Sequence, residues 1–132
     1  MILLVDASAA VDLLVRSEPG EQVRRLLMNS RDVTLITVAH LDAEVLSALA
    51  RLHRAQALTE AEVDELLARL TGLAMQRLPI SPDLLLAAWA LRDNVAARDA
   101  LYVAAAHAVQ GRLLTTDDRL ARAVPDIAVR LT

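Results

Sequence analysis

ILLVDAS, Ile2–Ser8, is an apolar run that ends at an acidic residue near the start of the sequence. The four apolar residues Ile2–Val5 predict a short strand buried on both faces, as strands of a parallel sheet are. Asp6 follows this strand directly, and an apolar helix is expected from Ser8 to Leu14. In open parallel sheets, functional sites form beyond the carboxyl ends of the strands. Asp6 is therefore the first candidate for a functional residue.

Outward from this strand, apolar and β-branched runs alternate with helical patterns. Four further strands are predicted, which makes about five in all: Val33–Thr37, Leu78–Ile80, Leu113–Thr115 and Ala128–Leu131. Helices are expected between them: from Pro19, from Val38 to about Arg54, from Thr59 to Gly72, from Ser81 through Leu91, from Asp99 to Gln110 and from Asp117 to Ala123. This alternation predicts a single domain, residues 1–132, with an α/β/α sandwich fold around a mostly parallel sheet.

The composition excludes several kinds of catalytic site. The 132 residues contain no cysteine, which removes disulfides, thiolate zinc sites and cysteine nucleophiles. All 14 basic residues are arginine, so Schiff-base lysines and lysine-containing phosphate loops are excluded as well. Charged residues or His break the apolar stretches within about a dozen positions, short of the roughly 20 that a membrane span needs. We therefore expect a cytoplasmic protein without a membrane segment.

The charge balance is unusual for a protein that binds nucleic acid. The formal net charge is −3, whereas nucleic-acid-binding domains are usually basic. This balance argues mildly against RNA unless several acids gather around cations. Trp89 and Tyr102 are the only aromatic residues, so stacking on bases can contribute little. RNA recognition would have to rest on shape and on Arg contacts with phosphates.

Four acidic residues from separate segments are expected to meet at one edge of the sheet. Asp6 follows a predicted strand directly, and Asp117 follows another after one further threonine. Asp99 stands at the start of its predicted helix, and Glu44 lies one to two turns into the helix after the second strand. Taken singly, such acids are more typical of helix caps and turns. Glu44 stands out because it lies beside an apolar stripe, where an unpaired charge is costly.

Such a cluster needs a counter-ion. Carboxylates a few ångströms apart repel each other, and some would stay protonated at neutral pH without a cation. Mg²⁺ suits an all-oxygen site and keeps several waters beside one or two carboxylates, whereas Zn²⁺ usually has Cys and His ligands. One or two such ions would serve phosphodiester chemistry. Seven nearby acids are interpreted instead as capping or solvated positions: Asp12, Asp42, Glu60, Asp64, Glu65, Asp83 and Asp118.

Other catalytic groups are not indicated. His40, His53 and His107 share no ligand spacing, and no catalytic role is expected for them. Ser8 and Ser47 have no obvious His partner in the sequence, so a serine-type triad is not predicted. Only three glycines are present, which leaves no Gly-rich phosphate loop.

Four sequence blocks resemble the signature blocks of PIN-domain proteins, in the order found in that family. They are VDAS (Val5–Ser8), LDAEVLSAL (Leu41–Leu49), RDALYVAAA (Arg98–Ala106) and LLTTDDRL (Leu113–Leu120). A single block of this kind has little specificity, but together the four span nearly the whole chain. Within the family, the chain is most similar to the VapC-like toxins of type II toxin–antitoxin pairs.

The resemblance implies that the catalytic, metal-binding acids are Asp6, Glu44, Asp99 and Asp117. Asp117 rather than Asp118 takes the last role, because the family's block reads Thr-x-Asp and Thr115 has that spacing.

Three further residues are candidates for supporting roles. The hydroxyls of Ser8 and Thr115 would orient a carboxylate or a water, although Thr115 also fits a plain strand residue. Arg98 would contact a substrate phosphate, with a solvated residue at a helix start as the alternative.

The resemblance further implies a magnesium-dependent endoribonuclease, with Mn²⁺ as a substitute, that leaves a 5′-phosphate and a 3′-hydroxyl. Its partners would be the RNA substrate, a cognate antitoxin protein and a second copy in a homodimer. We expect a partner to cover exposed apolar residues on the early helices: Val11, Leu14, Val23 and Leu27.

Three other functions remain as alternatives. A structure-specific DNA nuclease is the nearest, but similar proteins of that kind are usually much longer. A non-catalytic PIN-type binding module would retain the fold alone, although the intact acid set argues against it. A phosphoacceptor signalling domain normally needs a lysine near the phosphorylated aspartate, and this chain has none.

Overall fold

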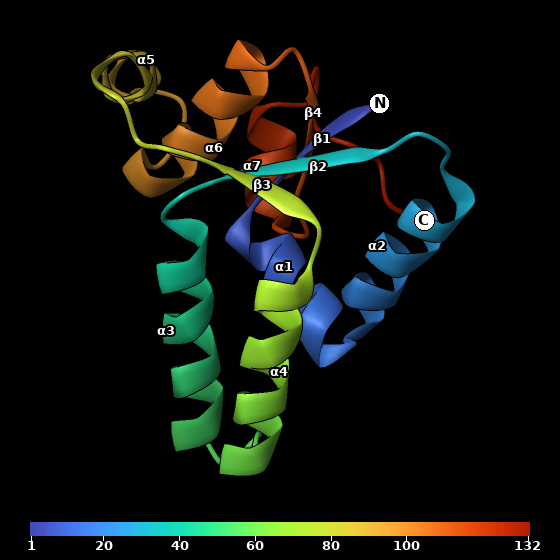
Figure 1. The fold of residues 1–132 in the computed structure, drawn as a ribbon. Coiled ribbons are helices and arrows are strands. Elements are labelled where there is room, and N and C mark those ends of the chain that lie inside the picture. The colour runs from blue at the N-terminus through green and yellow to red at the C-terminus, as the bar shows by residue number, and fades with distance from the viewer.

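A computed structural model describes residues 1–132, and strands alternate with helices along this chain. The elements are β1 (Ile2–Val5), α1 (Ala7–Val15), α2 (Glu18–Asn29), β2 (Thr34–Val38), α3 (Leu41–Arg54), α4 (Glu60–Gly72), β3 (Met75–Leu78), α5 (Pro82–Ala90), α6 (Ala97–Ala108), β4 (Arg112–Leu114) and α7 (Asp118–Ala123). The strands form one parallel sheet in the order β3–β2–β1–β4 (Figure 1). The predicted parallel sheet is confirmed, with four strands rather than about five.

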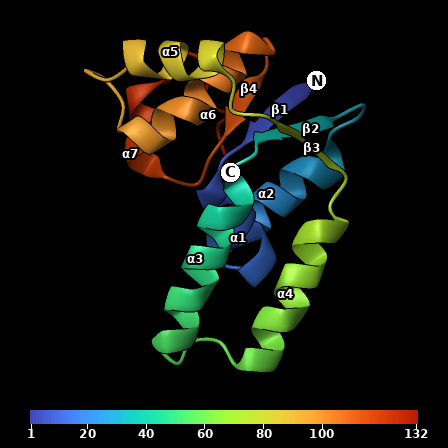
Figure 2. The ribbon, with the colours of Figure 1, turned by 60° about the vertical axis from the view of Figure 1, so that its left-hand side comes forward.

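Helices cover both faces of this sheet. α6 packs against β1, β2 and β4 with α5 beside it, and α1 lies among α2, α3 and α4 on the opposite face (Figure 1, Figure 2). α3 and α4 run side by side away from the sheet. The predicted α/β/α sandwich is therefore confirmed. None of the helices combines the length and the apolar character that crossing a membrane would require.

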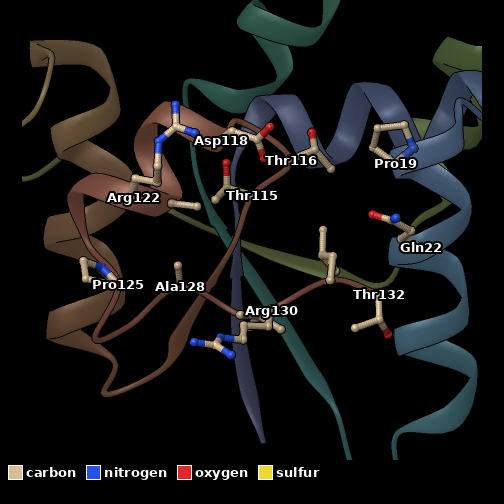
Figure 3. A pocket seen from close by; sticks show the side chains of 13 residues that line it. Pro19, Gln22, Thr115, Thr116, Asp118, Arg122, Pro125, Ala128, Arg130 and Thr132 are labelled. Atoms are coloured by element: carbon tan, nitrogen blue, oxygen red, sulfur yellow. The ribbon is translucent and has the colours of Figure 1, made fainter.

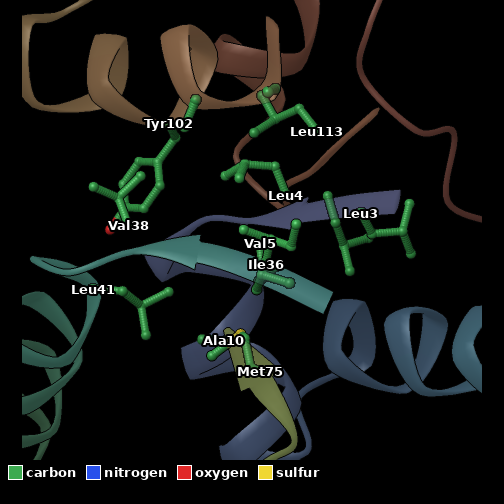
Figure 4. Packing of buried hydrophobic residues seen from close by; sticks show 14 of the residues in the cluster. Leu3, Leu4, Val5, Ala10, Ile36, Val38, Leu41, Met75, Tyr102 and Leu113 are labelled. Atoms are coloured by element: carbon green, nitrogen blue, oxygen red, sulfur yellow. The ribbon is translucent and has the colours of Figure 1, made fainter. Parts of the chain in front are cut away.

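β1 lies at the centre of the core, between β2 and β4. Leu3 and Leu4 are fully buried, and side chains from both helical layers meet around this strand, with Tyr102 on one side and Ala10 on the other (Figure 4). A strand buried on both faces needs a continuous apolar run. The run Ile2–Val5 meets that need, which is why the sequence predicted this strand within its observed bounds.

Two helix starts follow from local signals in the sequence. Thr59 and Glu62 form the predicted capping box, with reciprocal side-chain to backbone hydrogen bonds of 2.9 and 3.1 Å. Ser81 caps α5 by accepting a hydrogen bond from the Leu84 N–H at 3.1 Å, and Pro82 follows it. Both signals depend on residues within three positions of each other, so the sequence alone reveals them.

α1 and α2 approach each other closely at Gly20. A β-carbon at this position would lie 1.8 Å from the backbone oxygen of Asp12. Ser17 caps α2 beside this contact and accepts from the Gly20 N–H at 3.1 Å. Only glycine permits so close a backbone contact. The result is a tight α1–α2 pair that holds Asp12 near the end of β1.

The predicted exposed apolar surface on the early helices is wrong. Leu14 and Val23 are buried, and Val11 and Leu27 are half-buried, because α1 and α2 pack against each other and against the core. Seven other large apolar side chains are exposed, one on α2, three on α5 and three elsewhere: Met28, then Leu85, Leu86 and Trp89, then Met1, Leu46 and Ile80.

Two element bounds near β2 differ from the prediction. The third strand is Met75–Leu78 rather than Leu78–Ile80, because Pro79 has no N–H for the ladder and the strand ends before it. Val38 pairs with Leu78 at the end of β2. The helix predicted from Val38 therefore begins only at Leu41.

The predicted edge strand Ala128–Leu131 is reduced to a single bridge between Ala128 and Leu113. Two backbone hydrogen bonds of 2.9 Å hold it, from the Leu113 N–H to the Ile127 oxygen and from the Val129 N–H to the Leu113 oxygen. Residues 129–132 form no further ladder pair with β4, although all three residues of β4 pair with β1 on its other side. This accounts for the missing fifth strand.

Candidate functional site

A pocket opens at the edge of the sheet where β1 and β4 end. The Asp6 N–H donates to the Leu114 oxygen at 3.2 Å, which joins the two strand ends. The pocket has a volume of about 290 Å³, and four of the residues that line it are the acids predicted from the sequence: Asp6, Glu44, Asp99 and Asp117. Ser8 and Arg98 line it as well. The structure thus brings together carboxylates from four separate segments, and we call this space the acidic pocket.

Asp6 is the most buried of the four acids, with 3% of its surface exposed. It caps α1, since its Oδ1 accepts from the Ala9 N–H at 2.9 Å and from the Ser8 hydroxyl at 2.8 Å. The Thr115 hydroxyl donates to its Oδ2. Burial raises the pKa of Asp6 to about 6 and outweighs these hydrogen bonds, which lower it, while the charge of Asp99 adds a small upward effect.

The hydroxyls of Ser8 and Thr115 join the two strand ends. Their oxygens lie 3.1 Å apart. The Ser8 oxygen also accepts from the Thr116 N–H, and the Thr115 oxygen accepts from the Asp117 N–H, both at 3.1 Å. Thr115 is buried and therefore needs these partners. Both predicted hydroxyls contact Asp6, and Thr115 also holds the backbone that carries Asp117.

Asp99 and Asp117 both line the pocket, and the negative charge of Asp117 acts on Asp99. Burial raises the pKa of Asp99, and the charges of Asp117 and Glu44 raise it further, while Arg98 opposes them. Asp117 caps α7, because its Oδ1 accepts from the N–H groups of Arg119 and Leu120 at 2.9 and 3.2 Å. The capping role and a place in the pocket therefore coexist in one side chain.

Two residues that sequence reasoning did not place in the site lie against Glu44, and one of them, Tyr102, forms a hydrogen bond to it. The Tyr102 hydroxyl donates to Glu44 Oε1 at 2.6 Å. His40 stacks on the Tyr102 ring, with centroids 4.5 Å apart, and its Nε2 lies 3.3 Å from the same Glu44 oxygen. Burial and the bond to Glu44 raise the pKa of Tyr102, so the phenol stays a donor. Helical spacing was the available signal, since His40 precedes Glu44 by four residues and Tyr102 follows Asp99 by three.

Asp12 is a fifth carboxylate that lines the acidic pocket, although the sequence suggested a solvated or capping position. Its Oδ2 accepts from the Thr116 hydroxyl at 2.6 Å, and its Oδ1 accepts from the Ser17 hydroxyl at 2.8 Å. It therefore fastens α1 to the segment between β4 and Asp117. No sequence pattern indicated this bond, because the two partners are 104 residues apart.

A family model, that of the PIN domain, matches residues 3–124 of the chain, nearly its full length. This chain belongs to the PIN-domain family. Among its relatives, ribonuclease VapC3 of Mycobacterium tuberculosis is 48% identical over 124 residues, which cover 93% of this chain and 88% of the relative. Ribonuclease VapC1 of the same organism is 40% identical over 121 residues, with coverage of 91% and 89%. The PIN domain described here is thus a VapC relative.

The fold comparison agrees. A toxin–antitoxin complex from Klebsiella pneumoniae contains a chain that superposes on this PIN domain with a TM-score of 0.66, over 96% of each chain. The identity is 19%, so this likeness concerns the fold alone.

The donor set of this PIN domain suits a hard cation. Several carboxylate oxygens have no hydrogen bond within the protein: both of Asp99, Oδ2 of Asp117 and Oε2 of Glu44. No three acidic or His side chains already surround a single point closely enough to bind one ion. Mg²⁺ does not need this, because it is usually bound through one or two carboxylates, waters and substrate phosphates. The residues therefore fit Mg²⁺ better than Zn²⁺.

The neighbouring acids Asp42 and Asp118 lie outside the acidic pocket. Asp42 forms a bidentate pair with Arg77, at 2.7 and 3.0 Å. Asp118 lines a separate pocket of about 670 Å³ between α2, α7 and the end of the chain, which also contains Arg122 and Arg130 (Figure 3). Asp118 therefore lies in a different environment from Asp117, its direct neighbour in the sequence.

Proposed function

We propose that this VapC relative is a magnesium-dependent endoribonuclease and the toxin of a type II toxin–antitoxin pair. The observation that supports this most is the meeting of four carboxylates in one pocket beyond the ends of β1 and β4. Relatives of 40–48% identity bear the name ribonuclease, which suggests the substrate class.

The carboxylates Asp6, Glu44, Asp99 and Asp117 would hold the ion, Mg²⁺ or Mn²⁺ in its place. When bound, the ion would acidify water and stabilise negative charge on the attacked phosphate. A cation beside Asp6 would offset the burial that raises the pKa of this residue to about 6. The acids would then be ionised together at neutral pH, which their mutual repulsion otherwise opposes.

The surrounding side chains would orient this site. Three donors fix both oxygens of Asp6, and the Tyr102 hydroxyl fixes one oxygen of Glu44, which leaves the other oxygen free. Arg98 would contact a substrate phosphate through its guanidinium. Hydrolysis would add the oxygen of water to phosphorus and break the bond to the 3′ oxygen, which takes up a proton. The products would carry a 5′-phosphate and a 3′-hydroxyl.

The proposed partners are the RNA substrate, a cognate antitoxin protein and a second copy of this chain in a homodimer. The neighbour from Klebsiella pneumoniae is a toxin–antitoxin complex, which supports the second of these. The proposal assigns the protein to the cytoplasm, where RNA and the antitoxin would meet it.

A comparison of labelled RNA with labelled DNA of matching sequence tests the proposal. Cleavage of RNA in Mg²⁺ or Mn²⁺, abolished by EDTA and by Asp99→Asn, is the expected result. Cleavage that persists in EDTA, in a preparation whose Asp99→Asn control is inactive, would overturn the metal-dependent mechanism. Preferential cutting of DNA would favour the structure-specific DNA nuclease, and binding without cutting would favour a non-catalytic module.

A further inference from the structure

Two arginines line the acidic pocket without a carboxylate partner. Arg51 on α3 and Arg98 on α6 both border it, together with five acids. Neither forms an ion pair or a side-chain hydrogen bond, whereas other arginines of the chain do so elsewhere, with acids or with backbone oxygens. Both side chains are exposed. These two guanidinium groups form no ion pair although five acids line the same pocket, so they are available to bind an anion from solution.

Arg51 lies at the far end of this pocket from the sheet. Glu44, Ala48 and Arg51 line it at positions i, i+4 and i+7 of α3, which places them along one stripe of the helix. Two helical turns separate Glu44 from Arg51, about 10.5 Å along the axis. Val11 and Asp12 of α1, which packs against α3, line the same space. The pocket therefore runs from the acids along α1 and α3 to Arg51.

We infer that Arg51 binds a backbone phosphate of the RNA strand that flanks the bond being cut; this rests on the function proposed above. Arg98 directly precedes Asp99 in the sequence and lines the pocket beside the acids, so it is positioned to contact the phosphate that reacts. Arg51 begins two helical turns further along α3 than Glu44, with the small side chain of Ala48 between them, so it is placed for a neighbouring phosphate. A guanidinium matches a phosphate through two parallel hydrogen bonds.

Recognition of a phosphate rather than a base agrees with the other residues of the pocket. Tyr102 is the one aromatic residue that lines it, and its ring is already stacked with His40. Trp89 is on α5, outside the pocket, with Arg92 over its ring. Without an aromatic platform for bases, the strand must be held here by charge. Phosphate contacts carry no sequence information, so Arg51 would add affinity without adding sequence specificity.

The test is the salt dependence of RNA binding by Arg51→Gln, with Arg54→Gln as the matched control. Arg54 is on the same helix, exposed and without an ion pair, but it does not line the pocket. The probe is a fluorescein-labelled twelve-nucleotide RNA of mixed sequence, bound in Ca²⁺ and recovered uncut. Loss of one phosphate contact should lower the slope of log K against log salt by about 0.7 and weaken binding roughly tenfold at low salt. Arg51→Lys should restore most of the slope.

Shortening the probe to a dinucleotide, which has a single phosphodiester, separates the two arginines. Wild type should bind the twelve-nucleotide RNA more tightly than the dinucleotide, and this increase in affinity should be about tenfold smaller for Arg51→Gln. Equal slopes for Arg51→Gln and Arg54→Gln would overturn the inference, because both remove one charge from α3. Equal losses for Arg51→Gln on the dinucleotide and the longer RNA would also overturn it. Cleavage in Mg²⁺ is measured separately, so a failed function and a failed phosphate site give different results.

Discussion

Asp6→Asn should make the metal-free protein more stable at neutral pH. The pKa of Asp6 is about 6 in the fold, against 3.8 for an ordinary Asp, because burial disfavours the ionised form. Below pH 3.8 the carboxyl is protonated in both folded and unfolded chains and costs nothing. As the pH rises through 3.8 towards 6, the unfolded chain releases its proton first, and stability falls. Above pH 6 the full cost is about 3 kcal/mol.

The amide keeps most of the hydrogen bonds of Asp6. Its oxygen can accept from the Ala9 N–H and the Ser8 hydroxyl, and its NH₂ can donate to the Thr115 oxygen, which already accepts another N–H. Some geometry is lost, so we expect a net gain of about 1–2 kcal/mol over wild type in EDTA at pH 7.5. Saturating Mg²⁺ should reverse the order, because only the wild type gains from tight metal binding.

Urea unfolding followed by far-UV circular dichroism measures both effects. In EDTA, wild type should lose about 1.5 kcal/mol through this carboxyl between pH 5 and pH 7.5, and Asp6→Asn should lack that loss. Asp118→Asn, which changes a carboxyl outside the acidic pocket, should keep the wild-type decline. The reasoning is refuted if Asp6→Asn is the less stable protein in EDTA at pH 7.5 and shows an undiminished pH dependence.

The remaining predictions concern the site, the packing and the assembly. Residues that only orient metal ligands typically cost about tenfold to a hundredfold in activity when they are changed, and Asp117→Asn should reduce RNA cleavage in a gel assay by more than this. Asp118→Asn should stay near wild type in the same assay. A larger loss for Asp118→Asn than for Asp117→Asn would contradict the assignment of Asp117 as the metal ligand. Tyr102→Phe removes the donor to Glu44 and should lower cleavage about tenfold with an unchanged circular dichroism spectrum, and an unaffected rate would show that Glu44 is held without it. Gly20→Ala should lower the free energy of unfolding by about 1–3 kcal/mol, because its β-carbon meets backbone atoms of α1, and an equally stable variant would argue against that contact. Light scattering at tens of micromolar should give a dimer, and a monomer that also fails to bind the protein encoded beside it would contradict the proposed assembly.

Several features of this protein depend on residues close together in the sequence. The run Ile2–Val5 needs only its own apolar character to become a central strand. The capping box of Thr59 with Glu62 and the cap at Ser81 act over three residues. Asp6 followed from the same local reasoning, because the carboxyl end of a buried parallel strand is where such sites form. Four acids in the family's order then indicated the composition of the pocket.

Only the tertiary structure decided how these acids are held. Tyr102 reaches Glu44 from 58 residues away, and Thr115 reaches Asp6 from 109 residues away, so neither bond leaves a local pattern. Because α1 and α2 pack closely together, Leu14 and Val23 are buried, although the sequence alone suggested that they were exposed. The segment after Ala128 does not follow β4 beyond one bridge, so no fifth strand forms, because a ladder depends on the path of both partners. Local order sets periodicity and capping, whereas burial, pKa and hydrogen-bond partners depend on which distant segments the core brings together.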